Sequence, residues 1–238
     1  MLALPRTSRR NDPAEAVPPP AHAALAPLAF LFTDLQDSTG LYERVGDHDA
    51  YEIVHRHFCF VQRIVLASRG SVVKTTGDGV MAAFDRPVDA VKAALAIQGL
   101  IGHFNRSHAP ADDRRHVAIK LGVNWGGSLR VDAERGLDYF GSAVNLAARL
   151  RGHSRGGEVM LSEVVANDPG VRLLLGPLET CEENLPFKGF EGPVRVVRVM
   201  PRAGRGADAG GTEPAPAGVW SSIGAMRALW VLGGPRLS

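Results

Sequence analysis

Residues 28–39 read Leu-Ala-Phe-Leu-Phe-Thr-Asp-Leu-Gln-Asp-Ser-Thr, and this stretch decides the fold. The apolar run that ends at Thr33 is bounded by a turn signal, which is typical of a buried strand. Asp34 follows at the end of that strand, and Asp37-Ser38-Thr39 supplies side chains that cap the N-termini of helices. The stretch therefore predicts a buried strand that leads into a helix, with an aspartate at the junction.

Beyond this stretch, the expected elements alternate between helix and strand. Helical spacing of apolar residues covers about 41–67, with a break near Gly46-Asp47, and a β-hairpin is expected around Gly77-Asp78-Gly79. The remaining elements are a hairpin strand pair at 71–74 and 80–84, helices after Pro87 and over 142–151, and strands at 117–123, 128–131, 158–161, near 185 and at 194–199. This order predicts an α+β, ferredoxin-like split-βαβ domain with an antiparallel or mixed sheet and helices on one face.

The two ends of the chain differ in composition from its middle. Residues 1–27 are rich in proline and alanine, and residues 201–238 in glycine, proline and alanine. Such segments bury too little apolar surface to offset the entropy of ordering them. We therefore expect a disordered segment at 1–27, one compact domain at 28–200 and a disordered tail at 201–238.

Composition excludes several classes of function. The formal net charge of +2 lacks the basic excess that is typical of proteins that bind nucleic acid. Two cysteines make no disulfide framework, so we expect a reducing compartment and a cytoplasmic location. An apolar run of roughly 18–20 residues, which a membrane span needs, is absent from the sequence. No nucleic-acid partner and no membrane span are therefore expected.

Asp34 and Asp78 are candidate metal ligands. In a split-βαβ sheet the first strand lies beside the hairpin, so the two carboxylates would converge on one edge, and oxygen ligands suit hard cations. Each residue also has a structural explanation, Asp34 as a helix cap and Asp78 as a turn former. A helix that starts near Ser38-Thr39 would offer backbone N–H groups to phosphate oxygens. Phosphates beside two metal-binding carboxylates are typical of two-metal nucleotidyl chemistry.

Asn145 and Arg149 are four residues apart on the helix expected over 142–151. That spacing places both on one face, while the small side chains of Val144, Ala147 and Ala148 point the other way. The pair is either a functional surface or an ordinary solvated face.

Four segments together resemble the class III adenylate/guanylate cyclase catalytic domain: residues 32–39, 74–79, 122–126 and 138–149. They follow one another in the family's order and at its spacing, and Lys188-Gly189-Phe190 is similar to the family's late Lys-Gly turn. The resemblance covers about residues 28–200 and implies the ferredoxin-like fold already expected from the alternation of elements.

The resemblance also implies roles for the matched residues. Two divalent cations, Mg²⁺ or Mn²⁺, would be bound by Asp34, Asp78 and the backbone carbonyl of Leu35. Base selection would fall to Lys74 and Asp138, ribose orientation to Asn145, transition-state charge to Arg149 and the terminal phosphates to Lys188. The implied reaction is in-line attack of the ribose 3′-hydroxyl on the α-phosphate, with pyrophosphate as the leaving group.

The identity of the base has a physical check. Lysine only donates hydrogen bonds and an ionised aspartate only accepts them, which matches the N1 acceptor and N6 donor of adenine. Guanine reverses this pattern and would leave both side chains unpaired, at about 1–3 kcal/mol each. ATP is therefore the predicted substrate and cyclic AMP the predicted product.

The resemblance further implies a head-to-tail homodimer with two equivalent sites at its interface. The segments outside 28–200 offer no room for a sensor module, so we expect either a regulatory partner that acts in trans or a larger parent architecture. The alternatives are a catalytically silent cyclase-like domain that binds nucleotide or regulates, and a guanylate cyclase. A diguanylate cyclase would need a Gly-Gly-Asp/Glu-Glu-Phe signature, which residues 76–80 do not carry. One departure from many relatives is Leu137, which stands where they have glycine, and residues 132–136 before Asp138 are expected to form a loose loop.

Overall fold

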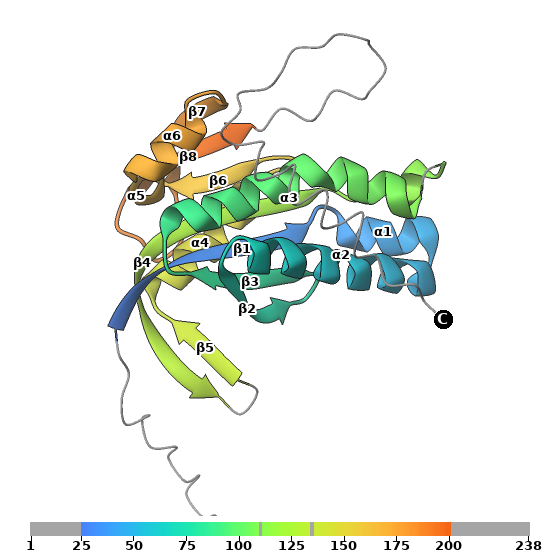
Figure 1. The fold of residues 1–238 in the computed structure, drawn as a ribbon, viewed down its shortest axis with the longest axis horizontal. Helices are drawn as coiled ribbons and strands as arrows, with labels where there is room; N and C mark the ends of the chain where they lie inside the picture. Colours follow the sequence, from blue (N-terminus) through green and yellow to red (C-terminus); the bar gives the residue numbers. More distant parts are fainter. Residues whose placement is uncertain (1–24, 110, 134–135, 201–238) are drawn as a thin grey trace, which may run out of the picture.

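The structure is a computed structural model that describes residues 25–109, 111–133 and 136–200. Helices and strands alternate along the chain (Figure 1). The elements are β1 (Leu25–Leu35), α1 (Ser38–Val45), α2 (Asp47–Ala67), β2 (Gly70–Thr76), β3 (Gly79–Phe84), α3 (Pro87–His108), the 3-10 turn η1 (Asp113–Arg115), β4 (Ile119–Ala133), β5 (Gly136–Phe140), α4 (Ser142–His153), β6 (Val159–Ser162), α5 (Glu163–Ala166), α6 (Pro169–Leu175), β7 (Glu179–Pro186) and β8 (Pro193–Met200). The predictions for residues 1–24 and 201–238 lie outside the described residues.

The strands form one mixed sheet in the order β2-β3-β1-β4-β6-β8-β7, with β5 paired to β4. β1 lies between β3 and β4 and is antiparallel to both, whereas β4 and β6 are parallel. The first strand thus separates the β2–β3 hairpin from β4, which is the split arrangement that the sequence predicts. The predicted α+β, ferredoxin-like class is confirmed.

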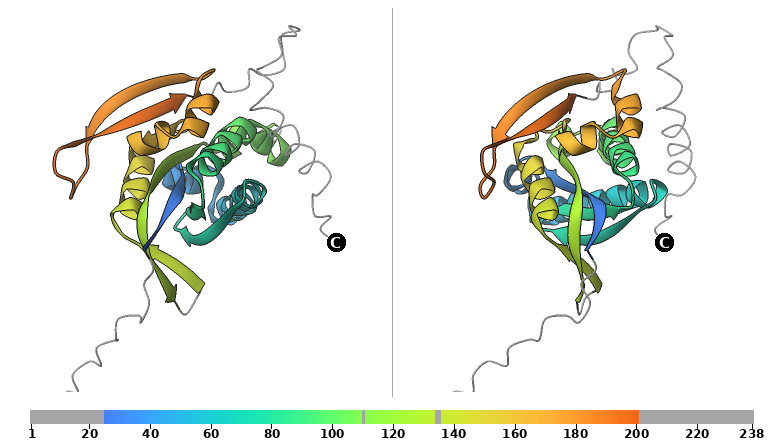
Figure 2. Two further views of the ribbon diagram at one scale, coloured as in Figure 1. Left: turned by 60° about the vertical axis from the view of Figure 1, so that its left-hand side comes forward. Right: turned by 90° about the vertical axis from the view of Figure 1, so that its left-hand side faces the viewer.

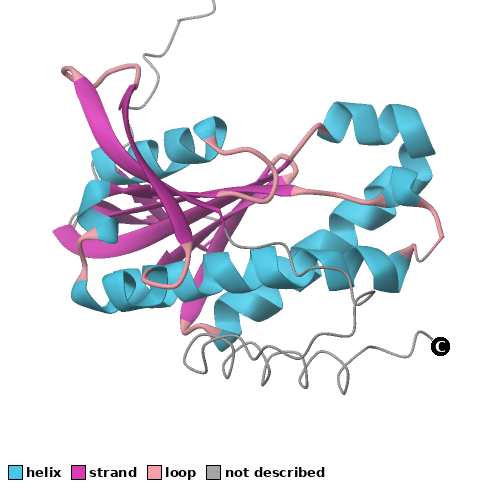
Figure 3. Cartoon of the chain, turned by 90° about the horizontal axis from the view of Figure 1, so that it is seen from above, coloured by secondary structure: helices cyan, strands magenta, loops and turns pink. Residues whose placement is uncertain are grey.

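Both faces of the sheet are covered by helices. Successive side chains of β1 alternate between the faces: Leu31 and Leu35 join the large core cluster with residues of α2 and α3, while Phe30 and Phe32 join a second cluster with residues of α4. Figure 2 shows α4 across the sheet from α2 and α3, and Figure 3 shows the same layers from above. The expectation of helices on one face is wrong for α4, because β1 is apolar on both of its faces.

β4 is one strand of 15 residues and not the two short strands that the sequence suggested. The break was expected between residues 123 and 128. Gly126 in that interval serves packing instead, since a Cβ there would lie 2.9 Å from the Cβ of Ala143 on α4. Within the segment 132–136, which was expected to form a loose loop, the described residues are paired: Asp132 lies opposite Leu137 and Ala133 opposite Gly136 in the β4–β5 ladder. The glycines and the polar residues of this region therefore led to a wrong prediction, because they are part of a continuous strand and its hairpin.

The helix boundaries near the start of the chain follow local signals. Asp37 caps α1 by accepting from the Gly40 N–H at 3.3 Å, and Gly46, with φ of 81°, separates α1 from α2. The predicted break near Gly46 is confirmed, whereas β1 begins at Leu25, three residues earlier than expected. Among the described helices, none combines the length and the apolar character that crossing a membrane requires.

Candidate functional site

Asp34 and Asp78 meet at one edge of the sheet, where β1 ends and the β2–β3 turn begins. The Val80 N–H donates to the buried hydroxyl of Thr33 at 3.0 Å, which joins the start of β3 to the end of β1. A Cβ on Gly79 would lie only 2.0 Å from the Thr33 carbonyl oxygen, so this close approach requires glycine. The second glycine of the Gly-Asp-Gly turn therefore brings the two carboxylates together.

The two carboxyl groups at this edge are close enough to affect each other's ionisation. Burial raises the pKa of Asp78, the Ser38 side chain lowers it by donating a hydrogen bond, and the neighbouring Asp34 carboxylate raises it again. Two carboxylates this close repel each other unless a proton or a cation lies between them.

This donor set fits a divalent cation. Within the described residues no group of three or more His, Cys, Asp or Glu side chains could hold a metal ion. Mg²⁺ is nevertheless commonly held by only one or two carboxylates, with water and substrate phosphates completing its coordination. Asp34, Asp78 and the Leu35 carbonyl at the same strand end match that pattern.

Two cations that the sequence analysis did not single out contact Asp34. The Lys120 Nζ lies 2.8 Å from Asp34 Oδ2, and the Arg151 Nη1 lies 3.5 Å from Oδ1. Lys120 is opposite Asp34 in the β1–β4 ladder. Arg151 comes from α4, which packs tightly on β4 because a Cβ on Gly122 would lie 2.2 Å from the Arg151 backbone nitrogen. Asp34 is thus surrounded by positive charge from two other elements.

α1 begins directly after this edge. Its cap residue Asp37 has φ of 55° and is held by Arg44, whose Nη1 lies 2.8 Å from Asp37 Oδ2. Ser38 is half-buried and reaches Asp78, and Thr39 is exposed in the first turn. The structure therefore places Ser38 beside Asp78, and Thr39 follows it in the first turn of α1.

Lys74 and Asp138 are in direct contact. The Lys74 Nζ lies 2.6 Å from Asp138 Oδ2, and Asp138 Oδ1 accepts from the Tyr139 N–H at 2.8 Å. A register shift in β2 between Val72 and Lys74 interrupts the ladder with β3, and Lys74 also lies 5.7 Å from the centre of the Phe140 ring. Residues on two separate strands thus form one donor–acceptor pair at the protein surface.

Asn145 and Arg149 lie on the side of α4 that faces away from the sheet. Asn145 is exposed, while Val144 and Ala147 are buried, as their spacing predicts. The Arg149 guanidinium lies 5.3 Å from the centre of the Phe190 ring. A Cβ on Gly189 would lie 3.6 Å from Arg149 Nη1, so the Lys188-Gly189-Phe190 turn runs directly past this guanidinium.

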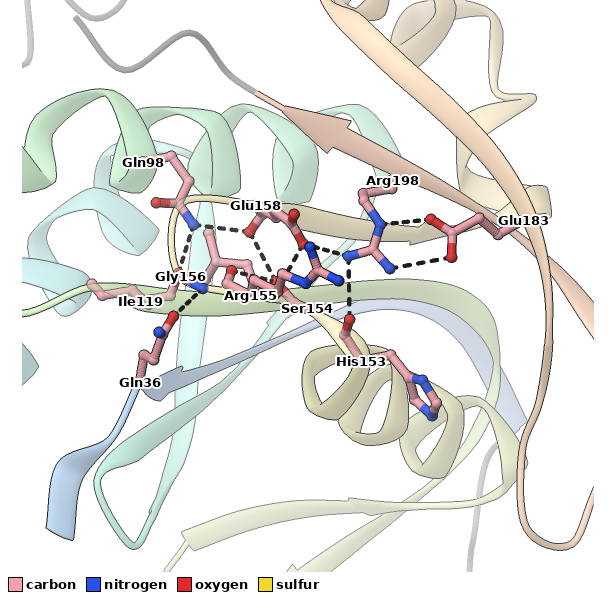
Figure 4. Close-up of polar contacts among 11 residues, drawn as sticks. Gln36, Gln98, Ile119, His153, Ser154, Arg155, Gly156, Glu158, Glu183 and Arg198 are labelled. Carbon is pink, nitrogen blue, oxygen red and sulfur yellow. Dashed lines mark hydrogen bonds and ion pairs between the residues drawn. The ribbon is translucent and has the colours of Figure 1, made fainter. Parts of the chain in front are cut away.

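The hairpin that carries this turn is fastened to the end of α4 (Figure 4). Arg198 of β8 donates to Glu183 of β7 at 2.6 Å and to the His153 carbonyl at 3.3 Å, and it also pairs with Glu158. Hydrogen bonds from Arg198 to Glu183 and Glu158 raise the pKa of this guanidinium, against the effect of its burial. The Ser154 hydroxyl bonds the Glu158 carbonyl at 3.1 Å. Arg149 on α4 and Lys188 in the β7–β8 turn therefore belong to two parts of the chain that these hydrogen bonds hold together.

The sheet topology makes this an α+β domain of the ferredoxin-like class. Sequence comparison identifies its family. The sequence model described as "Adenylate and Guanylate cyclase catalytic domain" matches residues 22–168, more than half of the chain. This chain belongs to that family.

Individual relatives agree with this assignment. An adenylate cyclase of Mycosarcoma maydis is 28% identical over 79% of this chain and 8% of its own length. A putative adenylate cyclase 3 of Rhizobium meliloti is 36% identical over 57% of this chain and 22% of its own length. The crystal structure of the adenylyl cyclase CyaB from P. aeruginosa superposes with a TM-score of 0.65 over 75% of this chain and 95% of that one, at 23% identity, and shows the shared fold. The chain thus spans less than a quarter of either curated relative.

Proposed function

We propose that this chain is an adenylate cyclase domain, which converts ATP to 3′,5′-cyclic AMP and pyrophosphate. The observation that carries the proposal is the 2.6 Å contact between Lys74 and Asp138. It fixes a group that only donates hydrogen bonds next to one that only accepts them. Adenine presents the complementary pair, an acceptor at N1 and a donor at N6.

Guanine would meet the same two side chains with the opposite pattern. Its O6 accepts where Asp138 also accepts, and its N1–H donates where Lys74 also donates. A polar group that the bound base buries without a partner costs about 1–3 kcal/mol, and 1.4 kcal/mol corresponds to a factor of ten in affinity. ATP is therefore favoured over GTP by the pair itself.

The other half of the site would hold the triphosphate. Asp34, Asp78 and the Leu35 carbonyl are proposed to hold two divalent cations, Mg²⁺ or Mn²⁺. Bound divalent cations lower the pKa of a coordinated hydroxyl and offset phosphate charge. The backbone N–H groups at Ser38 and Thr39 start α1, and the N-terminus of a helix attracts phosphate oxygens.

The reaction itself exchanges one phosphorus–oxygen bond for another. The ribose 3′-oxygen forms a bond to the α-phosphorus and loses its proton to solvent, while the bond from that phosphorus to the bridging oxygen breaks and releases pyrophosphate. Asn145 is proposed to orient the ribose, Arg149 to neutralise the charge that develops on the α-phosphoryl group, and Lys188 to contact the terminal phosphates. Positioning and charge stabilisation account for most catalysis of phosphoryl transfer.

A homodimer would complete the site. Within the described chain the guanidinium that contacts Asp34 is that of Arg151, whereas that of Arg149 lies over Phe190. Asn145 is exposed on the outer side of α4. We therefore assign Asn145 and Arg149 to the metal edge of a second copy, which gives two equivalent sites in a symmetric dimer.

Turnover by the purified chain tests the proposal. With ATP and Mn²⁺ we expect cyclic AMP and pyrophosphate in equal amounts, and Asp34→Asn and Asp78→Asn should each abolish product formation. Asp113→Asn is the matched control, because its side chain is 96% exposed on η1 and remote in sequence from the site. ATP binding without turnover under any metal would instead identify a silent cyclase-like domain.

A further inference from the structure

Arg151 is held at the carboxylate edge by its backbone. Its nitrogen packs against Gly122 of β4, where a Cβ would lie 2.2 Å away, and the Ala147 carbonyl packs there as well. Only 25% of the Arg151 side chain is exposed. The helix thus fixes the Arg151 backbone near the end of β1, and the guanidinium lies 3.5 Å from Asp34.

The pairing of Arg151 is incomplete. Its Nη1 lies 3.5 Å from Asp34 Oδ1, but its Nε is buried and has no hydrogen-bond partner within the described residues. A buried donor without a partner is destabilising, so stability alone does not explain the position of this side chain. The feature that this placement does provide is a fixed positive charge next to one oxygen of Asp34.

Lys120 forms an ion pair with the other oxygen of the Asp34 carboxylate. Its Nζ lies 2.8 Å from Asp34 Oδ2, so both oxygens that would bind a metal already face a cation from the protein. The two side chains are about equally buried, 24% exposed for Lys120 and 25% for Arg151. Arg151 differs from Lys120 in its chemistry, because a guanidinium keeps its charge in any protein environment.

We propose that Arg151 is a built-in counter-ion of Asp34 that weakens the binding of a free divalent cation and thereby couples metal loading to nucleotide loading. This inference rests on the proposed metal site. Like charges a few ångströms apart repel strongly in a partly desolvated site. The triphosphate of a nucleotide offsets the charge of Arg151. The divalent cation therefore binds tightly only when the nucleotide is also bound.

Direct binding of Mn²⁺ to the nucleotide-free protein, followed by the electron paramagnetic resonance of the free ion, tests this proposal. Arg151→Gln should bind Mn²⁺ about five- to tenfold more tightly than the wild type, because one like charge is removed. Arg151→Lys keeps the charge and should stay near the wild type. Arg56→Gln is the matched control, since it loses the same charge from a guanidinium that pairs with Glu52 on α2 and should leave the affinity unchanged.

The dependence on nucleotide gives a second readout. In the presence of a non-hydrolysable ATP analogue, the difference in Mn²⁺ affinity between Arg151→Gln and the wild type should shrink to less than about twofold. If Arg151→Gln fails to unfold cooperatively, Arg151→Met replaces it, because methionine retains most of the apolar stem.

Three results separate the possible failures. Unchanged or weaker Mn²⁺ binding by Arg151→Gln, while Asp34→Asn abolishes binding, would overturn the role of Arg151 and leave the metal site intact. Equal binding by Asp34→Asn and the wild type would overturn the metal site and this inference with it. Tighter binding by both Arg151→Gln and Arg56→Gln would show a general charge effect, and it would also overturn the specific role of Arg151.

Discussion

Lys74 and Asp138 are 64 positions apart in the sequence, yet Nζ and Oδ2 of the two side chains lie 2.6 Å apart. The contact depends on β5, which folds back from β4 and places Asp138 opposite Val131. It joins the strand next to the Gly-Asp-Gly turn with the strand that leads into α4. The pair therefore links two segments of the sequence motif set, and the proposed function assigns it the recognition of the base.

Reversing the hydrogen-bonding pattern of this pair should reverse the choice of base. In Lys74→Glu/Asp138→Asn, position 74 accepts and position 138 gains a donor, which suits guanine. We expect kcat/KM for ATP to fall about 10- to 100-fold, with a rise in the ratio of GTP to ATP turnover. Lys92→Glu, an exposed charge change on α3, is the control. An unaltered ratio in the double variant would exclude the pair from base selection.

Arg149→Ala should lose turnover and keep substrate binding. An arginine that neutralises transition-state charge contributes about 10³–10⁵ to the rate of phosphoryl transfer. We expect kcat to fall by that order while the KM for ATP changes little. Steady-state kinetics measure both quantities. Nearly intact cyclic AMP production would show that this guanidinium does not act on the reacting phosphate.

Phe190 should matter through its ring. The contact of 5.3 Å with the Arg149 guanidinium is a cation–π interaction, worth about 0.5–1 kcal/mol at a partly exposed site. Phe190→Leu should therefore lower kcat about two- to fivefold at constant KM, whereas Phe190→Tyr should keep it. Equal kinetics of the Leu and Tyr variants would argue that the ring does not position Arg149.

Arg198 should dominate the stability of the β7–β8 hairpin. It pairs with Glu158 and Glu183, and its side chain is only 15% exposed. Arg198→Ala leaves two carboxylates without their partner, and we expect a loss of about 2–3 kcal/mol in the free energy of unfolding. Arg195→Ala also removes an arginine with two carboxylate partners, but its side chain is 50% exposed, so its cost should stay below about 1 kcal/mol. Urea unfolding of both variants makes the comparison, and equal losses would contradict it.

His57 predicts how stability depends on pH. It is fully buried in α2, both ring nitrogens lack a partner within the described residues, and burial lowers its pKa from 6.5 to about 4. Between these two values the unfolded chain binds a proton that the folded chain excludes, so the free energy of unfolding falls as the pH is lowered. From pH 7 to pH 5 this contribution is about 2 kcal/mol.

His57→Leu should therefore lose about 2 kcal/mol less stability than the wild type between pH 7 and pH 5, as measured by urea unfolding at each pH. The comparison uses the change with pH, because the substitution also alters packing at both pH values. His55→Leu, on the exposed side of the same helix, should behave as the wild type. Parallel pH profiles for His57→Leu and the wild type would show that His57 titrates normally.

The parts of the fold that local sequence encodes could be predicted. The apolar run before Asp34 and the Gly-Asp-Gly turn indicate a strand and a hairpin, and the split-βαβ topology then places Asp34 beside Asp78. The helical spacing of Asn145 and Arg149 likewise predicts their common face. These features depend on residues close together in the chain.

The remaining features depend on contacts between distant segments. Lys120 meets Asp34 because of the β1–β4 register, and Arg151 reaches it because Gly122 lets α4 approach β4. In the sequence, Gly122 and Gly126 cannot be told apart from glycines that form turns. In the structure, both allow α4 to pack closely on β4. The contact of Phe190 with Arg149 also requires the position of the β7–β8 hairpin, which no local pattern specifies.

Competition between the two purine nucleotides tests the central claim most directly. The purified chain is given equal concentrations of ATP and GTP with Mn²⁺, and both cyclic nucleotides are quantified in one reaction. The Lys74–Asp138 pair predicts that cyclic AMP exceeds cyclic GMP by at least about tenfold. Equal amounts of the two products, or an excess of cyclic GMP, would contradict the account.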